Sequence, residues 1–240
     1  EDVSNAISDH YLPIGNNSAT SKKPISYSVA ITDKIDTLVG FFLINEKPTS
    51  SKDPFALRRS AIGLLKTIID NKLNLKLRNL ISYNIKLFEE QEIKKINQNA
   101  ENEILNFLKE RMKNILRDKN VKSDIIEASI SSYFSDNYFD LYKKNTLMNK
   151  YINKEAGINA ISSYKRAFNI VESAKENLSG RPDAVLFRKD EEKHLFEKLN
   201  EIRKSLTVNE QEKDYEKLLL SLSEIKIFTD KFFDNVIVND

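Results

Sequence analysis

The sequence contains no cysteine and no tryptophan, and only five glycines and five prolines among its 240 residues. Without cysteine, the chain can form neither a disulfide nor a thiolate zinc site nor a cysteine nucleophile. The scarcity of glycine and proline argues against a β-sandwich or β-barrel and favours helices joined by short turns. The first residue is glutamate rather than methionine, so we expect a piece of a longer protein.

Histidine is scarce as well. His10 and His194 are the only two, and they are far apart in the sequence. They leave little material for a histidine-based metal site. No run approaches the ~18 apolar residues that a membrane span needs, and no signal peptide opens the chain. We therefore expect a cytoplasmic protein that does not contact membranes.

An excess of one charge is missing as well. The 38 Lys and Arg residues nearly balance the 36 Asp and Glu residues, which leaves a net charge of +2. Global attraction to nucleic acid is therefore weak, and any RNA contact must come from local basic clusters.

What the sequence does contain is helical periodicity, with apolar residues recurring at intervals of three and four. This spacing predicts helices at about 27–43, 75–90, 102–118, 121–134, 136–150, 154–177, 190–206 and 210–233. Asp53 followed by Pro54 predicts the start of one more helix, with Asp53 as its N-cap and Pro54 at the first helical position. The predicted fold class is all-α.

The segment from Glu89 to Glu103 has few apolar residues and several asparagines. We interpret this segment as a linker between two packed helical domains, residues 1–97 and 98–240. Further along, five aromatic residues at helical spacing are predicted to lie in the core: Tyr133, Phe134, Tyr138, Phe139 and Tyr142.

Two helices carry stripes of polar side chains that could bind RNA. On the first, Lys109, Lys113 and Arg117 recur every four residues and could follow a phosphate backbone. On the second, the stripe consists of Ser162, Arg166, Asn169 and Ser173. Arginine and asparagine are suited to base edges and phosphates. The alternative for the first stripe is a solvated face, and the alternative for Arg166 is an ion pair between helices, for instance to Asp234.

The buried side of this second helix is predicted from its large apolar residues, Ile158, Ile161, Phe168 and Val171.

Asp33 and Asp36 lie three residues apart on one predicted helix and share a face. Such a pair could bind a divalent ion or act as acid and base. A purely structural role is the alternative. No Gly-rich phosphate loop and no Ser/His/Asp set accompanies them.

Three stretches resemble the beta subunit of the heterotetrameric bacterial glycyl-tRNA synthetase. They are TDKIDTLVGFF at 32–42 with KPTSSKDPFALRRSAIGLL at 47–65, then SYKRAFNIV at 163–171, then FTDKFFDNVIV at 228–238. Their order and spacing match that family, and the resemblance is to its C-terminal portion.

This resemblance implies that residues 1–97 form the later part of a degenerate HD-type helical domain, with Asp33 and Asp36 as remnant positions. Residues 98–240 would form a tRNA-binding region, and its core at about 151–240 would be an anticodon-binding helical bundle like that of arginyl-type synthetases. The tRNA-binding candidates are then Lys109, Lys113, Arg117, Lys165, Arg166, Asn169 and Asn235.

The resemblance also implies a supporting role in the ATP-dependent attachment of glycine to its tRNA. The partners would be glycine tRNA and the alpha subunit, in a heterotetramer that does not bind DNA. ATP and magnesium would be used by the alpha subunit, so this piece needs no catalytic residue, metal or cofactor of its own. A metal-dependent HD phosphohydrolase and a non-catalytic helical scaffold are the alternatives.

Overall fold

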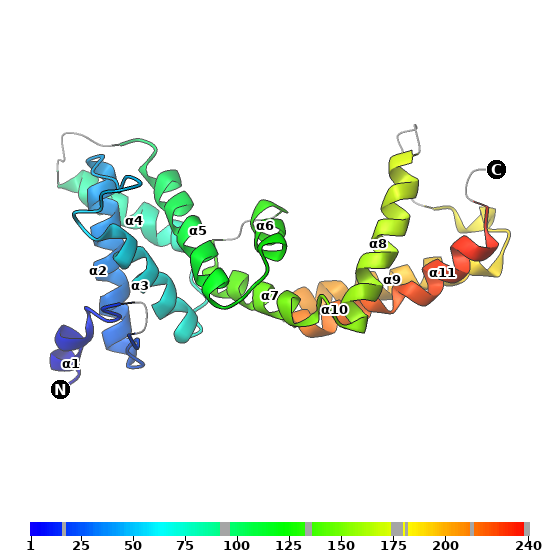
Figure 1. The fold of residues 1–240 in the computed structure, drawn as a ribbon, viewed down its shortest axis with the longest axis horizontal. Helices are drawn as coiled ribbons and strands as arrows, with labels where there is room; N and C mark the ends of the chain where they lie inside the picture. The colour runs from blue at the N-terminus through cyan, green and yellow to red at the C-terminus, as the bar shows by residue number, and fades with distance from the viewer. Residues whose placement is uncertain are drawn as a thin grey trace. The chain divides into compact units, whose positions relative to one another are not determined.

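The computed structural model describes residues 1–15, 18–91, 97–132, 136–173, 180, 182–211 and 214–237. These residues form helices and connecting turns and contain no strand (Figure 1). The predicted all-α fold class is therefore confirmed. The chain divides into two compact units, residues 1–146 and 147–240.

The first unit is built around helix α2. Its helices are α1 (Asp2–Asp9), α2 (Pro24–Leu43), α3 (Leu57–Asp70), α4 (Leu77–Glu90), α5 (Ala100–Asp118) and α6 (Ser123–Ser132). Helix α2 packs against α1, α3, α4 and α5, while α5 also packs against α3, α4 and α6. The fully buried side chains of this core include Leu38, Leu43, Leu64, Leu65, Ile68, Ile104, Leu108 and Met112.

The start of α3 differs from its prediction. Residues 53–56 form a turn, and the helix begins only at Leu57, after Ala56 with a left-handed φ of 53°. The Asp53 carboxylate still accepts hydrogen bonds from the backbone N–H groups of Leu57 and Arg58, at 2.9 and 3.0 Å. Asp53 therefore does bind the first free N–H groups of the helix, as a capping residue should, but it does so across the turn. The prediction that Pro54 is the first helical residue is wrong.

The division between the units also lies elsewhere than the predicted linker. Asn97 donates its backbone N–H to the Leu43 carbonyl at 2.9 Å and its side-chain amide to Glu103 at 2.7 Å. Glu103 in turn pairs with Lys47 at 2.7 Å. These bonds hold the segment around residue 97 to the end of α2, inside the first unit. Residues 92–96 of the predicted linker lie outside the described residues.

Helix α7 (Tyr138–Tyr151) contains the point at which the two units divide. Tyr138 is fully buried, as predicted, and donates its hydroxyl to the Leu105 carbonyl at 3.2 Å. Phe139 and Tyr142 are half-buried. The other two members of the predicted aromatic cluster, Tyr133 and Phe134, lie outside the described residues.

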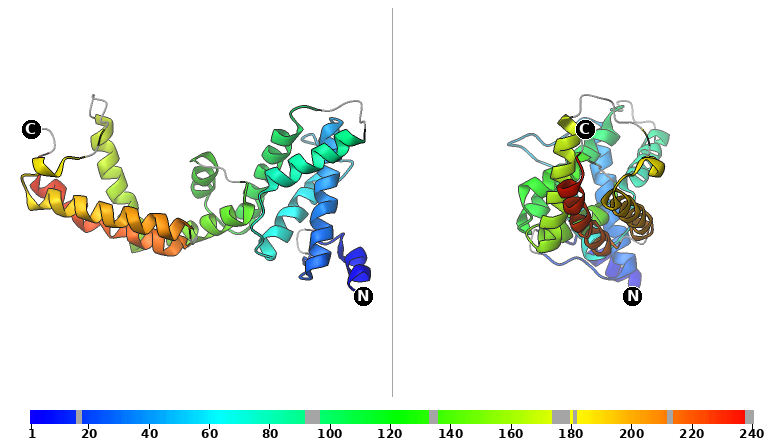
Figure 2. Two further views of the ribbon diagram at one scale, coloured as in Figure 1. Left: turned by 180° about the vertical axis from the view of Figure 1, so that it is seen from behind. Right: turned by 90° about the vertical axis from the view of Figure 1, so that its right-hand side faces the viewer.

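The second unit contains α8 (Glu155–Ser173), the 3₁₀ helix η1 (Ala184–Leu186), α9 (Asp190–Gln211), α10 (Tyr215–Ser223) and α11 (Ile225–Asn235). Helices α10 and α11 each pack against both α8 and α9, and Figure 2 shows α9 and α11 running side by side. The single helix predicted at 210–233 is wrong, because the chain breaks at Glu224 into α10 and α11. Glu224 pairs there with Lys198 of α9 at 2.7 Å.

Within the described part of the chain, no helix has both the length and the apolar character that a membrane span requires.

Candidate nucleic-acid interface

Helix α8 turns a different face inward from the one that its large apolar residues predict. Ile158, Ile161, Phe168 and Val171 are between 37% and 55% exposed, whereas Ser163 is only 4% exposed. The predicted buried side of α8 is therefore wrong. The inward face carries small residues at a spacing of three and four, namely Ala160, Ser163 and Ala167. Small side chains let helix backbones approach closely, and the Ser163 hydroxyl reaches the Thr229 hydroxyl of α11 at 3.3 Å.

The outward face of α8 presents an aromatic pair that the sequence analysis missed. Tyr164 is 66% exposed and Phe168 is 45% exposed. Their rings stack with centroids 5.6 Å apart and planes 28° from parallel. The spacing of four between Tyr164 and Phe168 was a signal that the two rings share one side of a helix, but it does not say whether that side is buried.

Lys165 and Asn169 are exposed next to the aromatic pair on the same helix. Unpaired bases stack on exposed aromatic rings regardless of their sequence. A lysine can bind a phosphate, and an asparagine can bind a base edge. The outward face of α8, defined by Tyr164, Lys165, Phe168 and Asn169, therefore combines the side chains that bind single-stranded RNA.

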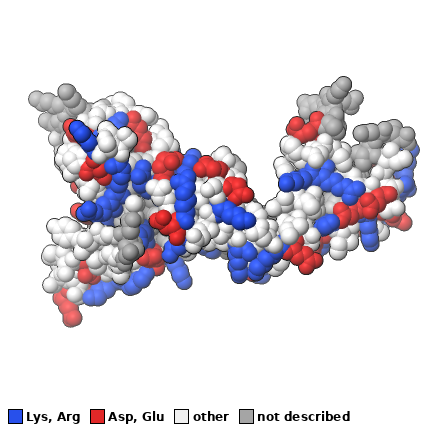
Figure 3. Space-filling view, viewed as in Figure 1, with Lys and Arg blue, Asp and Glu red and all other residues white. Residues whose placement is uncertain are grey.

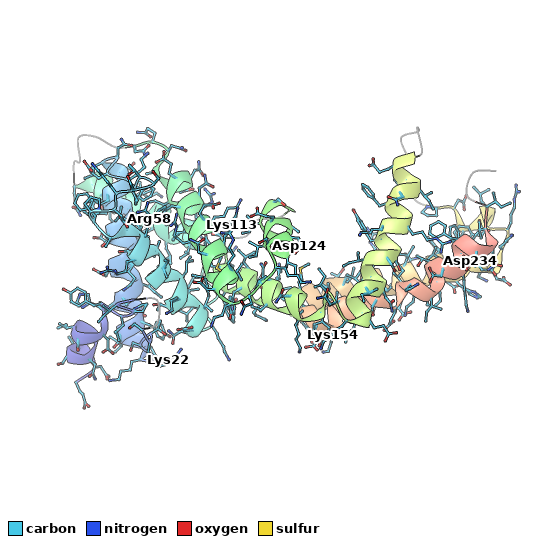
Figure 4. The ribbon with its side chains drawn as sticks, in the orientation of Figure 1. Lys22, Arg58, Lys113, Asp124, Lys154 and Asp234 are labelled. Carbon is cyan, nitrogen blue, oxygen red and sulfur yellow. The ribbon has the colours of Figure 1, made fainter. Side chains whose placement is uncertain are left out.

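Arg166 lies beside this face and is bound to helix α11. Its guanidinium pairs with Asp230 at 3.3 Å and with Asp234 at 3.2 Å, and it lies 4.7 Å from the centre of the Phe233 ring. The ion pair to Asp234, which the sequence offered as the alternative for Arg166, is confirmed. Figure 4 labels Asp234 on α11. Contact between Arg166 and RNA stays a prediction.

Asp230 is shared between two cations. Lys226, one turn earlier on α11, donates a hydrogen bond to its carboxylate. This bond lowers the pKa of Asp230, and the positive charge of Arg166 lowers it further. At the end of α11, the exposed Asn235 donates its amide to the Lys231 carbonyl at 2.8 Å and accepts a bond from Lys189 at its own backbone carbonyl. Asn235 stays a candidate RNA contact on exposure alone.

The basic stripe of α5 is largely paired with carboxylates. Lys113 contacts Glu110 and Glu127, each at 3.2 Å, and Arg117 lies 3.9 Å from Glu127. The hydrogen bond to Glu127 is the main cause of the raised pKa of Lys113. Lys109 is half-buried. Figure 3 shows acidic and basic side chains interleaved over the visible face of each unit, so α5 presents no unbroken basic track. RNA contact there stays a prediction.

Asp33 and Asp36 are exposed on α2, where they line a shallow depression with Ser28, Val29 and Thr32. Lys34 between them is buried on the opposite side, and its ammonium donates to the His10 carbonyl at 2.9 Å. Burial lowers the pKa of Lys34. Among the described residues, no three His, Asp or Glu side chains converge in a group that could hold a metal ion.

Comparison with known proteins gives consistent matches. A family model described as glycyl-tRNA synthetase beta subunit matches residues 1–131. The glycine–tRNA ligase beta subunit of Rickettsia canadensis (strain McKiel) is 38% identical over 240 residues, which cover 100% of this chain and 34% of that protein. The corresponding subunit of Ruegeria sp. (strain TM1040) is 32% identical over 244 residues, with the same coverage of the two chains. The chain thus spans about a third of the length of these relatives.

Proposed function

Since the chain belongs to the bacterial glycyl-tRNA synthetase beta subunit family, we propose that it is a tRNA-recognition portion of a glycine–tRNA ligase. The outward face of α8 would contact glycine tRNA. In this proposal an alpha subunit, with ATP and magnesium, activates glycine and attaches it to the tRNA. The beta subunit positions that tRNA.

The observation that carries the proposal is the exposed stack of Tyr164 and Phe168. The two rings are 66% and 45% exposed to water, so their outer sides can accept a base. Sequence-specific RNA recognition targets loops, where unpaired bases can be splayed out and stacked. The anticodon loop is such a target. Beside the rings, Lys165 offers an ammonium group that can bind a phosphate, and Asn169 offers an amide that can bind a base edge.

A titration of the chain with glycine tRNA tests the proposal, with a tRNA of changed anticodon as the second ligand. We expect the double variant Tyr164→Ala/Phe168→Ala to bind glycine tRNA roughly 5- to 150-fold more weakly, since one stacked base contributes about 1–3 kcal/mol. The matched control is Tyr83→Ala on α4, whose ring is 64% exposed in the other unit. It should bind as the unchanged chain does.

Two results would refute this assignment. One is equal and negligible binding of both tRNAs by the unchanged chain. The other is an equal loss of affinity in the double variant and in the Tyr83→Ala control. In a full-length beta subunit assembled with its alpha subunit, the same double substitution should raise KM for tRNA and leave ATP-dependent activation of glycine unchanged, because the α8 face would act on tRNA alone.

A further inference from the structure

Two arginines of the first unit lie where helices α3 and α5 pack together. Arg58 is in the first turn of α3, and Arg111 is near the middle of α5. The guanidinium of Arg111 lies 4.9 Å from the centre of the Phe107 ring, which packs against Phe42 with centroids 5.4 Å apart. Burial lowers the pKa of Arg111, and the nearby positive charge of Arg58 lowers it further. The two cations are thus held close enough to repel each other.

Arg111 forms no hydrogen bond and no ion pair with any residue that the structure describes, and its Nε atom is fully enclosed without an acceptor. Enclosing a guanidinium N–H without a partner is costly, and ordinary folded proteins avoid it. A group of this kind calls for an explanation, such as an ion that binds the same side chain.

The carboxylates around Arg111 are engaged elsewhere. Glu110 pairs with Lys113 at 3.2 Å. Asp53 accepts the backbone N–H groups of Leu57 and Arg58 and lies 3.9 Å from the Arg58 guanidinium. The charges of Glu110 and Asp53 partly offset the effect of Arg58 on the pKa of Arg111, but neither carboxylate forms an ion pair or a hydrogen bond with Arg111.

Arg58 is partly exposed to solvent. Its side chain is 30% exposed, and it donates to the Thr49 carbonyl in the loop that precedes α3. That loop is closed by the mutual bonds of Thr49 and Lys52, and its Ser50, Ser51 and Lys52 side chains are exposed. Figure 4 labels Arg58 in the first unit.

We infer that Arg58 and Arg111 form a binding site for a phosphate group, at the seam of α3 and α5. A phosphate offers several oxygens to two planar guanidinium groups and forms charge-assisted bonds with both. It would neutralise the repulsion between the arginines and supply an acceptor to Arg111. The phosphate could come from an RNA backbone or from a free phosphate compound such as a nucleotide. This site lies in the unit that does not contain α8, and it goes beyond the tRNA contact proposed above.

Thermal unfolding with and without inorganic phosphate, at ionic strength matched with sodium chloride, tests the site. At a phosphate concentration about ten times the Kd, binding to the folded state contributes about 1.4 kcal/mol and should raise the Tm of the unchanged chain by roughly 3–6 °C. Arg111→Gln and Arg58→Gln should each lose this gain. Arg59→Gln, which neutralises an exposed neighbouring arginine on α3, should keep it.

Unfolding in sodium chloride without phosphate gives the Tm of each variant by itself, so a variant that folds poorly can be recognised. Since Arg111→Gln removes one of two repelling charges, it should unfold in sodium chloride at a Tm close to or above that of the unchanged chain. Arg58→Gln also loses its bonds to Thr49 and Asp53, so its phosphate gain is measured against its own Tm in sodium chloride. Arg111→Lys, which keeps the charge, should retain part of the phosphate gain. An equal phosphate gain in the unchanged chain and in Arg58→Gln would overturn the inference.

A titration with glycine tRNA then identifies the source of the phosphate. For an RNA phosphate, Arg111→Gln should weaken tRNA binding and reduce the slope of log affinity against log salt by about 0.7 to 0.9 for the one lost contact. Arg59→Gln should do neither. For a free phosphate compound, tRNA affinity should stay the same while the phosphate-dependent gain in Tm is lost. The phosphate arm needs no RNA, so its failure can be told apart from a failure of the α8 proposal.

Discussion

Arg166, a proposed RNA contact, is already bound by side chains of α11. Asp230 and Asp234 occupy its guanidinium from α11, and Phe233 lies against its face. An RNA phosphate would have to displace at least one carboxylate to bind it. The pairs are only partly shielded, since the Arg166 side chain is 39% exposed and that of Asp234 67% exposed. Exchange with a phosphate is therefore inexpensive.

We predict that Asp234→Asn raises the affinity for glycine tRNA about two- to fivefold. The amide no longer competes for Arg166, and an exposed ion pair of this kind contributes about 0.2–1 kcal/mol. The measurement is the titration described above. Glu197→Gln makes the same change of charge at an exposed position of α9 and serves as the control. A lower affinity in Asp234→Asn would instead identify the pair as a purely structural link between α8 and α11.

At the scale of the element, α8 packs through its small residues. The predicted buried side of this helix, Ile158, Ile161, Phe168 and Val171, has the periodicity that usually marks a buried face, yet it lies outside. Gly157, at the start of this helix, lies against the backbone of the preceding turn. An added Cβ there would lie 2.3 Å from the Tyr151 carbonyl oxygen and 2.8 Å from the Ile152 Cα. The turn from α7 into α8 thus requires a residue without a side chain.

Gly157→Ala should therefore lower the free energy of unfolding of the second unit by roughly 1–3 kcal/mol, the usual range for overpacking. The atoms that the methyl group would meet belong to the backbone and cannot rotate away. Chemical denaturation monitored by circular dichroism measures the loss. Gly15→Ala is the matched control, because its added Cβ would have no neighbour within 4 Å. An equal and small effect of both substitutions would contradict the close approach at the start of α8.

At the scale of the whole molecule, the chain divides into two units, each with buried residues of its own. Leu64 lies in the core of the first unit, and Ile202 is 4% exposed in the second. We expect two calorimetric unfolding transitions. Leu64→Ala should lower one of them by roughly 5–15 °C, since such a cavity costs about 2–5 kcal/mol. Ile202→Ala should lower the other. A single transition that both substitutions shift equally would show one cooperative structure.

The sequence by itself determined that the protein is helical and where most helices lie, because the spacing of apolar residues and the scarcity of glycine and proline act locally. It also contained the resemblance to glycyl-tRNA synthetase beta subunits, which residues 1–131 and whole-chain relatives bear out.

Only the tertiary structure decided which face of α8 is buried, which carboxylates hold Arg166, and where the chain divides. Each of these depends on residues distant in the sequence. Ser163 lies against Thr229 of α11 while Phe168 is 45% exposed, and the bond from Asn97 to Leu43 keeps a polar segment inside the first unit. A helix with two possible inward faces contains no local signal for choosing between them, so its neighbours make the choice.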